Sequence, residues 1–512
     1  MTLSSTDAGI GLIYPVAFAV FAWYIGSCFI SWYRLREFPG PFWASVSYLW
    51  IGRLAWGGEH YKVHRELGRQ YGHLVRTGPN ELVTDDPEVM RRMSAARSPY
   101  HKDTWYLGAR LNAYHDNMFL ILDAHAHDKA KAKIFGAYSG REFPELERGI
   151  DFQVNHLMDI IRSRYVQSVD KAGLSRSLDL APLMSYFTLD VITQAAFGKA
   201  FGYLDTESDL YEWFETLRAF FPFASLSVNV PWIRNFFYSP IVLKFFGPKT
   251  TDKKGIGRLM WVAQNEVNKR FDSGAKEEND MLGSFIKHGL SREDCESEGL
   301  FMVVAGSETT ASALRVIMLY VMTTPRVYQK LKRIIADAVR DRTVSSPITY
   351  EQAKKIPYLQ AVLTEGLRMR PPAPSLFPKS VPKGGDTIHG KFVPEGTAIG
   401  MNTPSLMRSY EEFGPDPDVF RPERFMEADG TQRAKMERTV DLLFGYGRWI
   451  CAGKPVALME LNKVCFELLR AFDFQLENPL KPWDTEAYTI FMEYNFWVKV
   501  TDAKLMEHAT GT

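Results

Sequence analysis

The sequence predicts a mainly α-helical fold with a minor β region, preceded by one N-terminal transmembrane helix. Apolar residues recur at helical spacing in four segments, which are 151–165, 298–322, 325–340 and 350–369. Short strand-like runs are confined to 383–402, where Gly384-Gly385 and Pro394-Glu395-Gly396 interrupt them. No internal repeat, low-complexity tract or linker divides the chain after its N-terminal stretch.

The N-terminal stretch 8–33 carries no charged residue and is rich in Ile, Leu, Val, Phe and Trp. Its 26 residues exceed the roughly 20 that a helix needs to cross a bilayer. Arg34 and Arg36 follow it, so the positive-inside rule leaves the N-terminus outside the cytosol. A cleaved signal peptide is the alternative, but the stretch lacks a basic leader and is longer than a signal core. We therefore expect residues 1–38 to form a single-pass anchor in the endoplasmic reticulum membrane, and residues 39–512 to form one cytosolic domain.

The charge balance and the cysteine count exclude two classes of protein. Lys and Arg number 61 and Asp and Glu 60, which gives a net charge of +1. This balance argues against a nucleic-acid partner, because proteins that bind nucleic acid carry a basic excess. The four cysteines lie far apart, which excludes a disulfide scaffold and favours a reducing compartment. They are Cys28, Cys295, Cys451 and Cys465.

One of these cysteines lies in a glycine-rich frame, F-G-Y-G-R-W-I-C-A-G, at 444–453. Gly447 permits a tight turn close to Cys451, and Phe444 would shield the sulfur from water. An expected helix at 454–472 starts beside Gly453, and its first N–H groups would stabilise a thiolate. No Cys or His stands at metal-cluster spacing, so a zinc or iron–sulfur cage is excluded here. A single thiolate suits an axial ligand of haem iron, and an inert buried cysteine is the alternative.

This frame resembles the signature of the cytochrome P-450 family, F-x-x-G-x-x-x-C-x-G. The resemblance implies a cytochrome P-450 fold and a haem b (heme) cofactor with Cys451 as the iron ligand. The family often has a propionate-binding arginine two residues before the cysteine. Trp449 stands there in this sequence, and Arg448 beside it is the substitute we expect. The G-R-aromatic-x-C variant is similar to fungal members related to pisatin demethylase.

A second motif, A-G-S-E-T-T at 305–310, lies in an apolar helical segment. Thr309 can bond back to the carbonyl one turn earlier and open the helix locally. Glu308 beside it adds an exchangeable proton, and dioxygen activation needs proton delivery. A polar strip on an ordinary helix is the alternative. The family carries [A/G]-G-x-[D/E]-T-T over the distal haem face, which implies that Thr309 and Glu308 are catalytic.

Glu365 and Arg368 stand three residues apart in T-E-G-L-R. As an exposed helix pair they would stabilise the fold by only about 0.2–0.5 kcal/mol. The later segment F-R-P-E-R-F at 420–425 matches a family motif, and the resemblance implies that Arg424 joins the pair in a buried triad. Such a triad is structural, and loss of one partner costs roughly 3–5 kcal/mol.

Three further residues stand where the family binds the haem propionates. His127 and Lys131 match the family's aromatic-x-x-x-Arg pair, and Lys379 occupies the position of another arginine. Lysine keeps the charge but loses the bidentate geometry of arginine. A solvated basic helix face is the alternative for 125–133. A metal site at its two histidines lacks an evident acid or Cys partner.

The substrate pocket is expected from resemblance to involve segments 100–106, 301–305 and 373–377 and the turn at Ile490 and Phe491. These segments are mostly apolar or aromatic, which fits a hydrophobic ligand. Plain core is the alternative for each segment. The aromatic stretch 220–246, interrupted by prolines, reads as helix ends and an apolar loop. It is either buried core or a surface that dips into the bilayer.

The combined motifs predict a haem-thiolate monooxygenase that oxidises an apolar small molecule, with a fungal secondary metabolite as the expected substrate class. The chain lacks the G-x-G-x-x-G fingerprint, so electrons would have to come from outside the chain. The resemblance implies that a membrane-bound NADPH–cytochrome reductase supplies them. Two alternatives stay open. One is a haem-thiolate isomerase or dehydratase that needs no dioxygen, and the other is a non-catalytic membrane-anchored haem binder.

Overall fold

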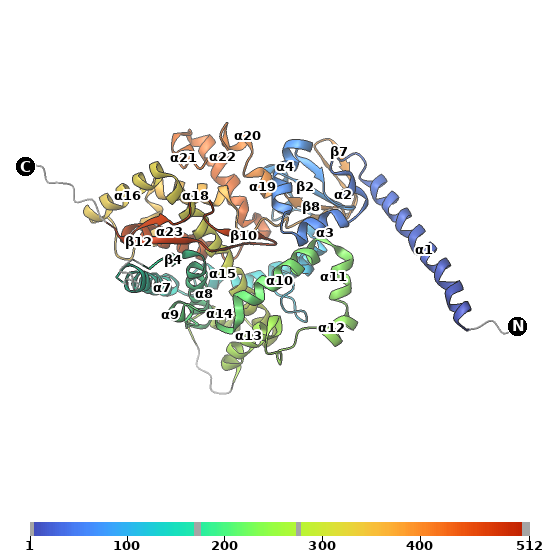
Figure 1. Ribbon diagram of the computed structural model, residues 1–512, viewed down its shortest axis with the longest axis horizontal. Helices are drawn as coiled ribbons and strands as arrows, with labels where there is room; N and C mark the ends of the chain where they lie inside the picture. Colours follow the sequence, from blue (N-terminus) through green and yellow to red (C-terminus); the bar gives the residue numbers. More distant parts are fainter. Residues whose placement is uncertain (1–4, 168–175, 273–277, 504–512) are drawn as a thin grey trace, which may run out of the picture.

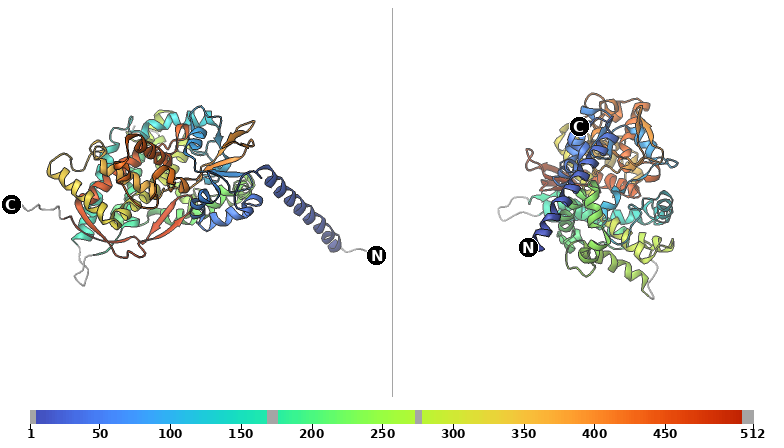
Figure 2. Two further views of the ribbon diagram at one scale, coloured as in Figure 1. Left: turned by 90° about the horizontal axis from the view of Figure 1, so that it is seen from above. Right: turned by 90° about the vertical axis from the view of Figure 1, so that its right-hand side faces the viewer.

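A computed structural model of the chain describes residues 5–167, 176–272 and 278–503. The described residues form a mainly helical body with small sheets, as the sequence predicts (Figure 1). Helix α1 projects from one end of this body, and the five-stranded sheet lies at that same end (Figures 1 and 2).

The helices have the following bounds: α1 (Ser5–Arg34), α2 (Phe42–Val46), α3 (Leu49–Trp56), α4 (His60–Tyr71), α5 (Pro87–Ser94), α6 (Ala124–Tyr138), α7 (Leu146–Ile161), α8 (Leu180–Phe197), α9 (Tyr203–Thr206), α10 (Trp213–Asn229), α11 (Pro231–Phe237), α12 (Pro240–Phe246), α13 (Gly255–Phe271), α14 (Met281–Lys287), α15 (Arg292–Thr323), α16 (Pro325–Arg340), α17 (Tyr350–Lys354), α18 (Pro357–Met369), α19 (Thr403–Leu406), α20 (Tyr410–Phe413), α21 (Arg424–Glu427), α22 (Gly430–Asp441) and α23 (Lys454–Ala471). Short 3-10 or π turns are η1 (Thr104–Ala109), η2 (Arg162–Val166), η3 (Leu210–Glu212), η4 (Leu442–Phe444) and η5 (Gly447–Trp449).

The strands are β1 (Leu74–Arg76), β2 (Glu81–Thr84), β3 (His101–Lys102), β4 (Leu178–Asp179), β5 (Lys379–Ser380), β6 (Asp386–Ile388), β7 (Lys391–Val393), β8 (Ala398–Met401), β9 (Phe472–Leu476), β10 (Asp484–Ala487), β11 (Phe491–Tyr494) and β12 (Trp497–Asp502). The largest sheet has the order β1-β2-β8-β5-β3, in which only the β2–β8 pair is parallel among the described strands. A second sheet has the order β4-β12-β9, and β6–β7 and β10–β11 are separate antiparallel pairs.

The long helix α15 runs through the core, where it packs against α8, α13, α18 and α23. Its start is fixed by a capping box, in which the side chains of Ser291 and Asp294 each accept from the other's backbone N–H. Among the described residues, α15 alone is long and apolar enough to cross a bilayer. Inside the protein, 78% of its apolar window is buried, so α15 is a core helix. The expected transmembrane span at 8–33 is not established by the structure and stays a prediction.

Two sequence predictions about helices need correction, and proline explains both. The segment 350–369 is two helices, because Pro357 starts α18 after an extended Ile356. The stretch 220–246 contains no long loop but the end of α10 followed by α11 and α12, since Pro231 and Pro240 each occupy the first turn of a new helix.

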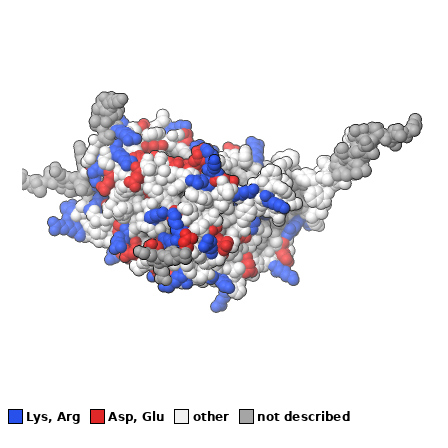
Figure 3. Space-filling model, turned by 90° about the horizontal axis from the view of Figure 1, so that it is seen from below, with Lys and Arg blue, Asp and Glu red and all other residues white. Residues whose placement is uncertain are grey.

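Helices α11 and α12 expose large apolar side chains, although Ile233 points inward. The exposed residues are Trp232, Phe236, Phe237, Ile241, Phe245 and Phe246. Helices α2 and α3 add the exposed side chains of Phe42, Trp43, Leu49 and Trp56. We call these ten residues the apolar rim. Figure 1 shows α2, α3, α11 and α12 at the end of the body from which α1 leaves. By contrast, the face in Figure 3 carries acidic and basic side chains interspersed over much of the body.

Candidate functional site

The loop before α23 holds Cys451 between two tight turns. Gly445 and Gly447 have φ values of 75° and 55°, in the left-handed region that favours glycine. A Cβ on Gly447 would lie 2.4 Å from the carbonyl oxygen of Ser94, so no other residue fits there without a backbone shift. The backbone N–H of Cys451 donates to the carbonyl oxygen of Phe444 at 2.6 Å. The sequence motif thus folds into a closed loop that fixes the position of the sulfur.

The thiol of Cys451 is accessible, whereas those of Cys295 and Cys465 are buried. Burial of the surrounding loop raises the pKa of the Cys451 thiol. The backbone N–H groups of Gly453 and Lys454 and the charge of Lys131 act in the opposite direction and favour the thiolate. Their orientation matches the expected role of the helix start. A metal ion placed against this sulfur would complete the stabilisation of the negative charge.

Four basic side chains gather around Trp449, two residues before Cys451. The ammonium groups of Lys102 and Lys379 lie 5.1 and 5.6 Å from the centre of its ring, and the ring of His127 lies 4.5 Å from it. Lys131 donates to the carbonyl oxygens on either side of Trp449, those of Arg448 and Ile450, at 2.8 and 2.9 Å. We call Lys102, Lys131, Lys379 and His127 the basic cluster.

The lysines of the basic cluster have no carboxylate within ion-pair distance in the described part of the chain. Burial lowers the pKa of Lys379 to about 7, and burial together with the charges of Lys379 and Lys131 holds that of Lys102 well below its usual value. Burial also lowers the pKa of His127, to about 3. Buried cations without counter-ions fit a ligand that brings carboxylates. Together with an accessible cysteine, this donor set fits a haem, whose propionates would meet the basic cluster.

Lys102 is the member of the basic cluster that sequence reasoning missed. It lies on β3, and its partner across the sheet is Lys379 on β5. The pairing joins residues that are far apart in the chain and belong to no common motif. Only knowledge of the sheet register could have identified it.

Arg448, the expected propionate contact, forms an ion pair in the structure. Its Nε donates to Asp128 Oδ2 at 3.0 Å, and this ion pair is partly exposed. The guanidinium therefore already has a carboxylate partner, and its central carbon lies 5.7 Å from the centre of the Trp449 ring, beside the basic cluster. The turn η5 carries both residues and places the indole of Trp449 among the basic residues.

Thr309 makes the expected bond, since its Oγ1 donates to the carbonyl oxygen of Ala305 at 2.8 Å. The predicted opening of the helix is absent, however, and α15 is continuous from Arg292 to Thr323. Phe301, Ala305 and Thr309 remain partly accessible, whereas their neighbours along the helix are mostly buried. This accessible stripe is the side of α15 that can face a ligand.

The carboxylate of Glu308, expected to supply protons beside Thr309, is paired inside the core. Arg315 Nη1 lies 3.2 Å from Glu308 Oε2 and 3.1 Å from Glu493 Oε2, and Ser185 bonds both Glu308 and Arg315. Consecutive helix residues point in different directions, so Glu308 turns into the core while Thr309 faces the accessible stripe. Burial favours the neutral form of Arg315, but its two carboxylate partners raise the pKa above its ordinary value.

Glu365, Arg368 and Arg424 form one fully buried cluster. Arg368 meets both carboxylate oxygens of Glu365, at 2.7 and 2.8 Å, and Arg424 Nε lies 3.0 Å from Glu365 Oε1. The two guanidinium groups also donate to backbone carbonyl oxygens of the 407–419 segment, which include those of Met407, Phe413, Asp416, Pro417 and Val419. The cluster therefore fixes the segment that leads towards the cysteine loop.

Aromatic rings form a wall between β5 and α15. Phe119 stacks on Phe301 with ring centres 4.9 Å apart, and it meets Tyr106 at 5.1 Å and Phe377 at 6.4 Å. Three of these residues lie in, or directly beside, the segments expected to contact substrate, and Phe119 was not foreseen. Phe491, from the expected closing turn, is fully buried under the guanidinium of Arg370, 3.9 Å away.

Comparison with known proteins agrees with this geometry. The sequence model of the family described as cytochrome P-450 matches residues 37–495. Cytochrome P-450 monooxygenase aba1 of Botryotinia fuckeliana is 52% identical over 475 residues, which cover 93% of each chain. Cytochrome P-450 monooxygenase abl1 of Leptosphaeria maculans is 49% identical over 471 residues, 91% of this chain and 83% of the relative. Pisatin demethylase of Fusarium vanettenii is 29% identical over 495 residues, 93% of this chain and 92% of the relative.

Proposed function

The chain belongs to the cytochrome P-450 family and is one of its monooxygenases, and from this premise we propose that Cys451 ligates a haem b used to oxidise an apolar small molecule. A fungal secondary metabolite is the substrate class we propose, because the relatives above are fungal enzymes. When bound, the haem supplies the reductive activation of dioxygen, with one oxygen atom entering the substrate and the other leaving as water.

The observation that carries this proposal is the accessible Cys451 beside the uncompensated basic cluster. The thiol offers one anionic ligand, and Lys102, Lys131 and Lys379 offer cations for two propionate groups. The indole of Trp449 lies 4.5 Å from the ring of His127 and is also approached by the ammonium groups of Lys102 and Lys379. The protein thereby sets the position of the bound group, the charges around it and its contact with water.

Proton supply is assigned to Thr309 and Glu308. The hydroxyl of Thr309 lies on the accessible stripe and can accept a proton from one side and donate one to the other. Glu308 is the acid behind it, and its carboxylate must leave Arg315 before it can serve Thr309. Arg315 is therefore a positioning residue that decides when the acid is free.

We also propose that the protein is held at the cytosolic face of the endoplasmic reticulum membrane by α1. The supports are the exposed apolar side chains of α1, among them Phe18, Trp23 and Ile30, and the apolar rim at the same end of the body. For the α11–α12 part of the stretch 220–246, the exposed apolar side chains favour a surface that dips into the membrane over buried core. An NADPH–cytochrome reductase in the same membrane would supply the electrons.

The test is spectroscopic and then catalytic. The full chain, reduced and exposed to carbon monoxide, should show the red-shifted Soret band of thiolate ligation, and Cys451→Ala should abolish it while Cys465→Ala keeps it. A band that survives in Cys451→Ala would overturn the ligand assignment. Product formation from an apolar substrate should require NADPH and reductase, whereas product without them would favour the isomerase or dehydratase alternative.

A further inference from the structure

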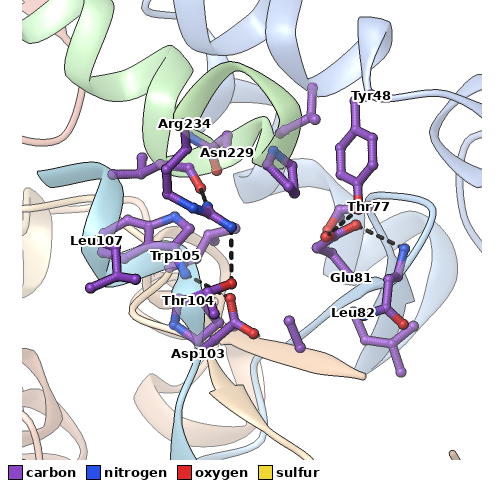
Figure 4. A pocket seen from close by; sticks show the side chains of 18 of the residues that line it. Tyr48, Thr77, Glu81, Leu82, Asp103, Thr104, Trp105, Leu107, Asn229 and Arg234 are labelled. Atoms are coloured by element: carbon purple, nitrogen blue, oxygen red, sulfur yellow. Dashed lines mark hydrogen bonds between the residues drawn. The ribbon is translucent and has the colours of Figure 1, made fainter. Parts of the chain in front are cut away.

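A cavity lined by none of the cysteine-loop residues 444–453 lies beside the aromatic wall. Its volume is about 350 Å³, which is at the small end of the range for ligand pockets. It is enclosed by α3, β2, η1, the end of α10 and α11, with Leu376 and Pro378 on the remaining side. Figure 4 shows Arg234, Trp105 and Asp103 on one side of this cavity and Tyr48 and Glu81 on the other.

The acceptors of this cavity are satisfied by the protein itself. Glu81 accepts from the hydroxyl of Tyr48 at 2.8 Å and from the backbone N–H of Asn80 at 2.9 Å. Asp103 accepts from the backbone N–H of Trp105 and from the hydroxyl of Ser380, each at 2.8 Å. Both carboxylates of the cavity therefore already hold donors from the protein.

Two donors of the cavity, in contrast, have no partner among the residues that the structure describes. They are the indole Nε1–H of Trp105 and the Nε–H of Arg234, on side chains only 6% and 5% exposed. The other nitrogens of Arg234 are used, by Thr104 Oγ1 at 2.9 Å and by the carbonyl oxygen of Val228 at 3.3 Å. A buried donor without an acceptor costs about 1–3 kcal/mol in general, so a bound oxygen atom would relieve a real penalty.

The charges of the cavity select a neutral ligand. Arg234 is opposed by Asp103 and Glu81, so a carboxylate would add a negative charge to a site that has no cationic excess. Burial raises the pKa of Glu81 to about 7, which keeps the site close to neutral at that pH. The remaining lining includes Ile51, Leu82, Leu107 and Val228 and suits an apolar body.

The position of the cavity points to the source of the ligand. Pro231 and Arg234 of α11 form one wall, and the same short helix exposes Trp232, Phe236 and Phe237 of the apolar rim. On the inner side, the ring of Trp105 packs on Tyr106 and Phe377 of the aromatic wall, at 5.2 and 5.6 Å. The cavity thus lies between the proposed membrane-facing surface and the proposed substrate site.

We propose that this cavity is a second binding site, which takes a neutral apolar molecule through a hydroxyl or carbonyl oxygen that accepts from Trp105 and Arg234. The inference rests on the proposed function, because the ligand is an apolar substrate or product in transit between membrane and haem. It adds a selection step before the chemistry, for molecules that already carry one oxygen.

The test measures binding of matched probes to the holoenzyme with imidazole on the iron, so that no probe can ligate the iron. The probes are naphthalene, 1-naphthol and 1-naphthoate, which share an apolar body and differ in the oxygen. Calorimetry should give 1-naphthol about tenfold tighter binding than either of the others. Trp105→Phe and Arg234→Gln should each weaken the binding of 1-naphthol by about tenfold.

Trp213→Phe is the matched control, because Trp213 is also a buried indole without a partner but lies outside the cavity. In protein labelled with 5-fluorotryptophan, 1-naphthol should shift the Trp105 fluorine resonance and leave that of Trp213 in place. Equal affinity in wild type, Trp105→Phe and Arg234→Gln, or an unmoved Trp105 resonance, would overturn the site. None of these readouts depends on turnover, so failure of the proposed function would appear separately, in the carbon monoxide spectrum.

Discussion

Arg315 holds Glu308 from two turns further along the same helix, with Nη1 3.2 Å from Glu308 Oε2. The same nitrogen lies 3.1 Å from Glu493 Oε2 on β11, which follows the expected substrate turn. One guanidinium thus serves two buried carboxylates that come from the proton-handling helix and from the substrate side. Arg315 therefore links Glu308 on α15 to Glu493 on β11.

Glu493→Gln should impair proton delivery by leaving Glu308 as the only carboxylate partner of Arg315 in this cluster. The acid would then be released less often, and we expect product formed per NADPH to fall about tenfold, with a matching rise in hydrogen peroxide. The solvent isotope effect on turnover should increase. Ser312→Ala removes only the hydrogen bond to Glu493 Oε1 and serves as the control. Unchanged coupling in Glu493→Gln would show that Arg315 does not control the acid.

Arg424→Met should destabilise the fold severely. It leaves Glu365 with one guanidinium and frees the backbone carbonyl oxygens of Phe413, Asp416 and Val419 that Arg424 satisfies. Removing one partner of a buried ion cluster costs about 3–5 kcal/mol of unfolding free energy. Urea unfolding followed by circular dichroism measures this loss. Arg433→Met, which breaks an exposed pair with Glu437, should change the midpoint little.

Lys102→Met should weaken haem retention without removing the thiolate ligand. Within the described residues, the ammonium of Lys102 donates only to the carbonyl oxygens of Met118 and Phe119 and forms no ion pair, so a propionate would give it an anionic hydrogen-bond partner. We expect haem transfer to apomyoglobin to accelerate about tenfold, with the carbon monoxide band still in its thiolate position. Lys129→Met, on the exposed face of α6, is the control. Equal rates of haem transfer in the two variants would mean that Lys102 does not bind a propionate.

The sequence was sufficient where short-range spacing determines the structure. The turn at Gly447, the bond from Thr309 to Ala305 and the pair of Glu365 and Arg368 all follow from residues within a few positions of one another. The helical periodicity of α15 and α23 is long and regular, so both were predicted closely.

The features that were missed depend on the register between distant segments. Lys102 meets the basic cluster because β3 pairs with β5, and Glu493 reaches Glu308 only through Arg315 across the α15–β11 contact. The spacing of residues along the chain does not indicate such pairings. The inward turn of Glu308 is of the same kind, because the partner that holds it was recognisable only in three dimensions.

Glu298 makes the pH dependence of stability testable at a buried acid away from Cys451. Its carboxylate is buried on α15 and accepts from the backbone N–H of Met118, and burial raises its pKa to about 7. The folded protein therefore keeps this proton up to about pH 7, whereas the unfolded chain releases it near pH 4.5. Since the folded state binds more protons in that window, this group lowers the unfolding free energy as the pH rises from about 4.5 to about 7.

Glu298→Gln keeps an acceptor for Met118 and removes the titration. The variant should gain stability relative to wild type as the pH rises through the window, by at most about 3 kcal/mol, because each pKa unit is worth about 1.4 kcal/mol. Urea unfolding at pH 5 and at pH 7.5 measures the difference. Glu293 is exposed on the first turn of the same helix, and Glu293→Gln should have the same unfolding free energy as wild type at both pH values. A constant difference between Glu298→Gln and wild type would mean that Glu298 is ionised in the folded protein throughout, held by a charge such as that of Lys102 rather than controlled by burial.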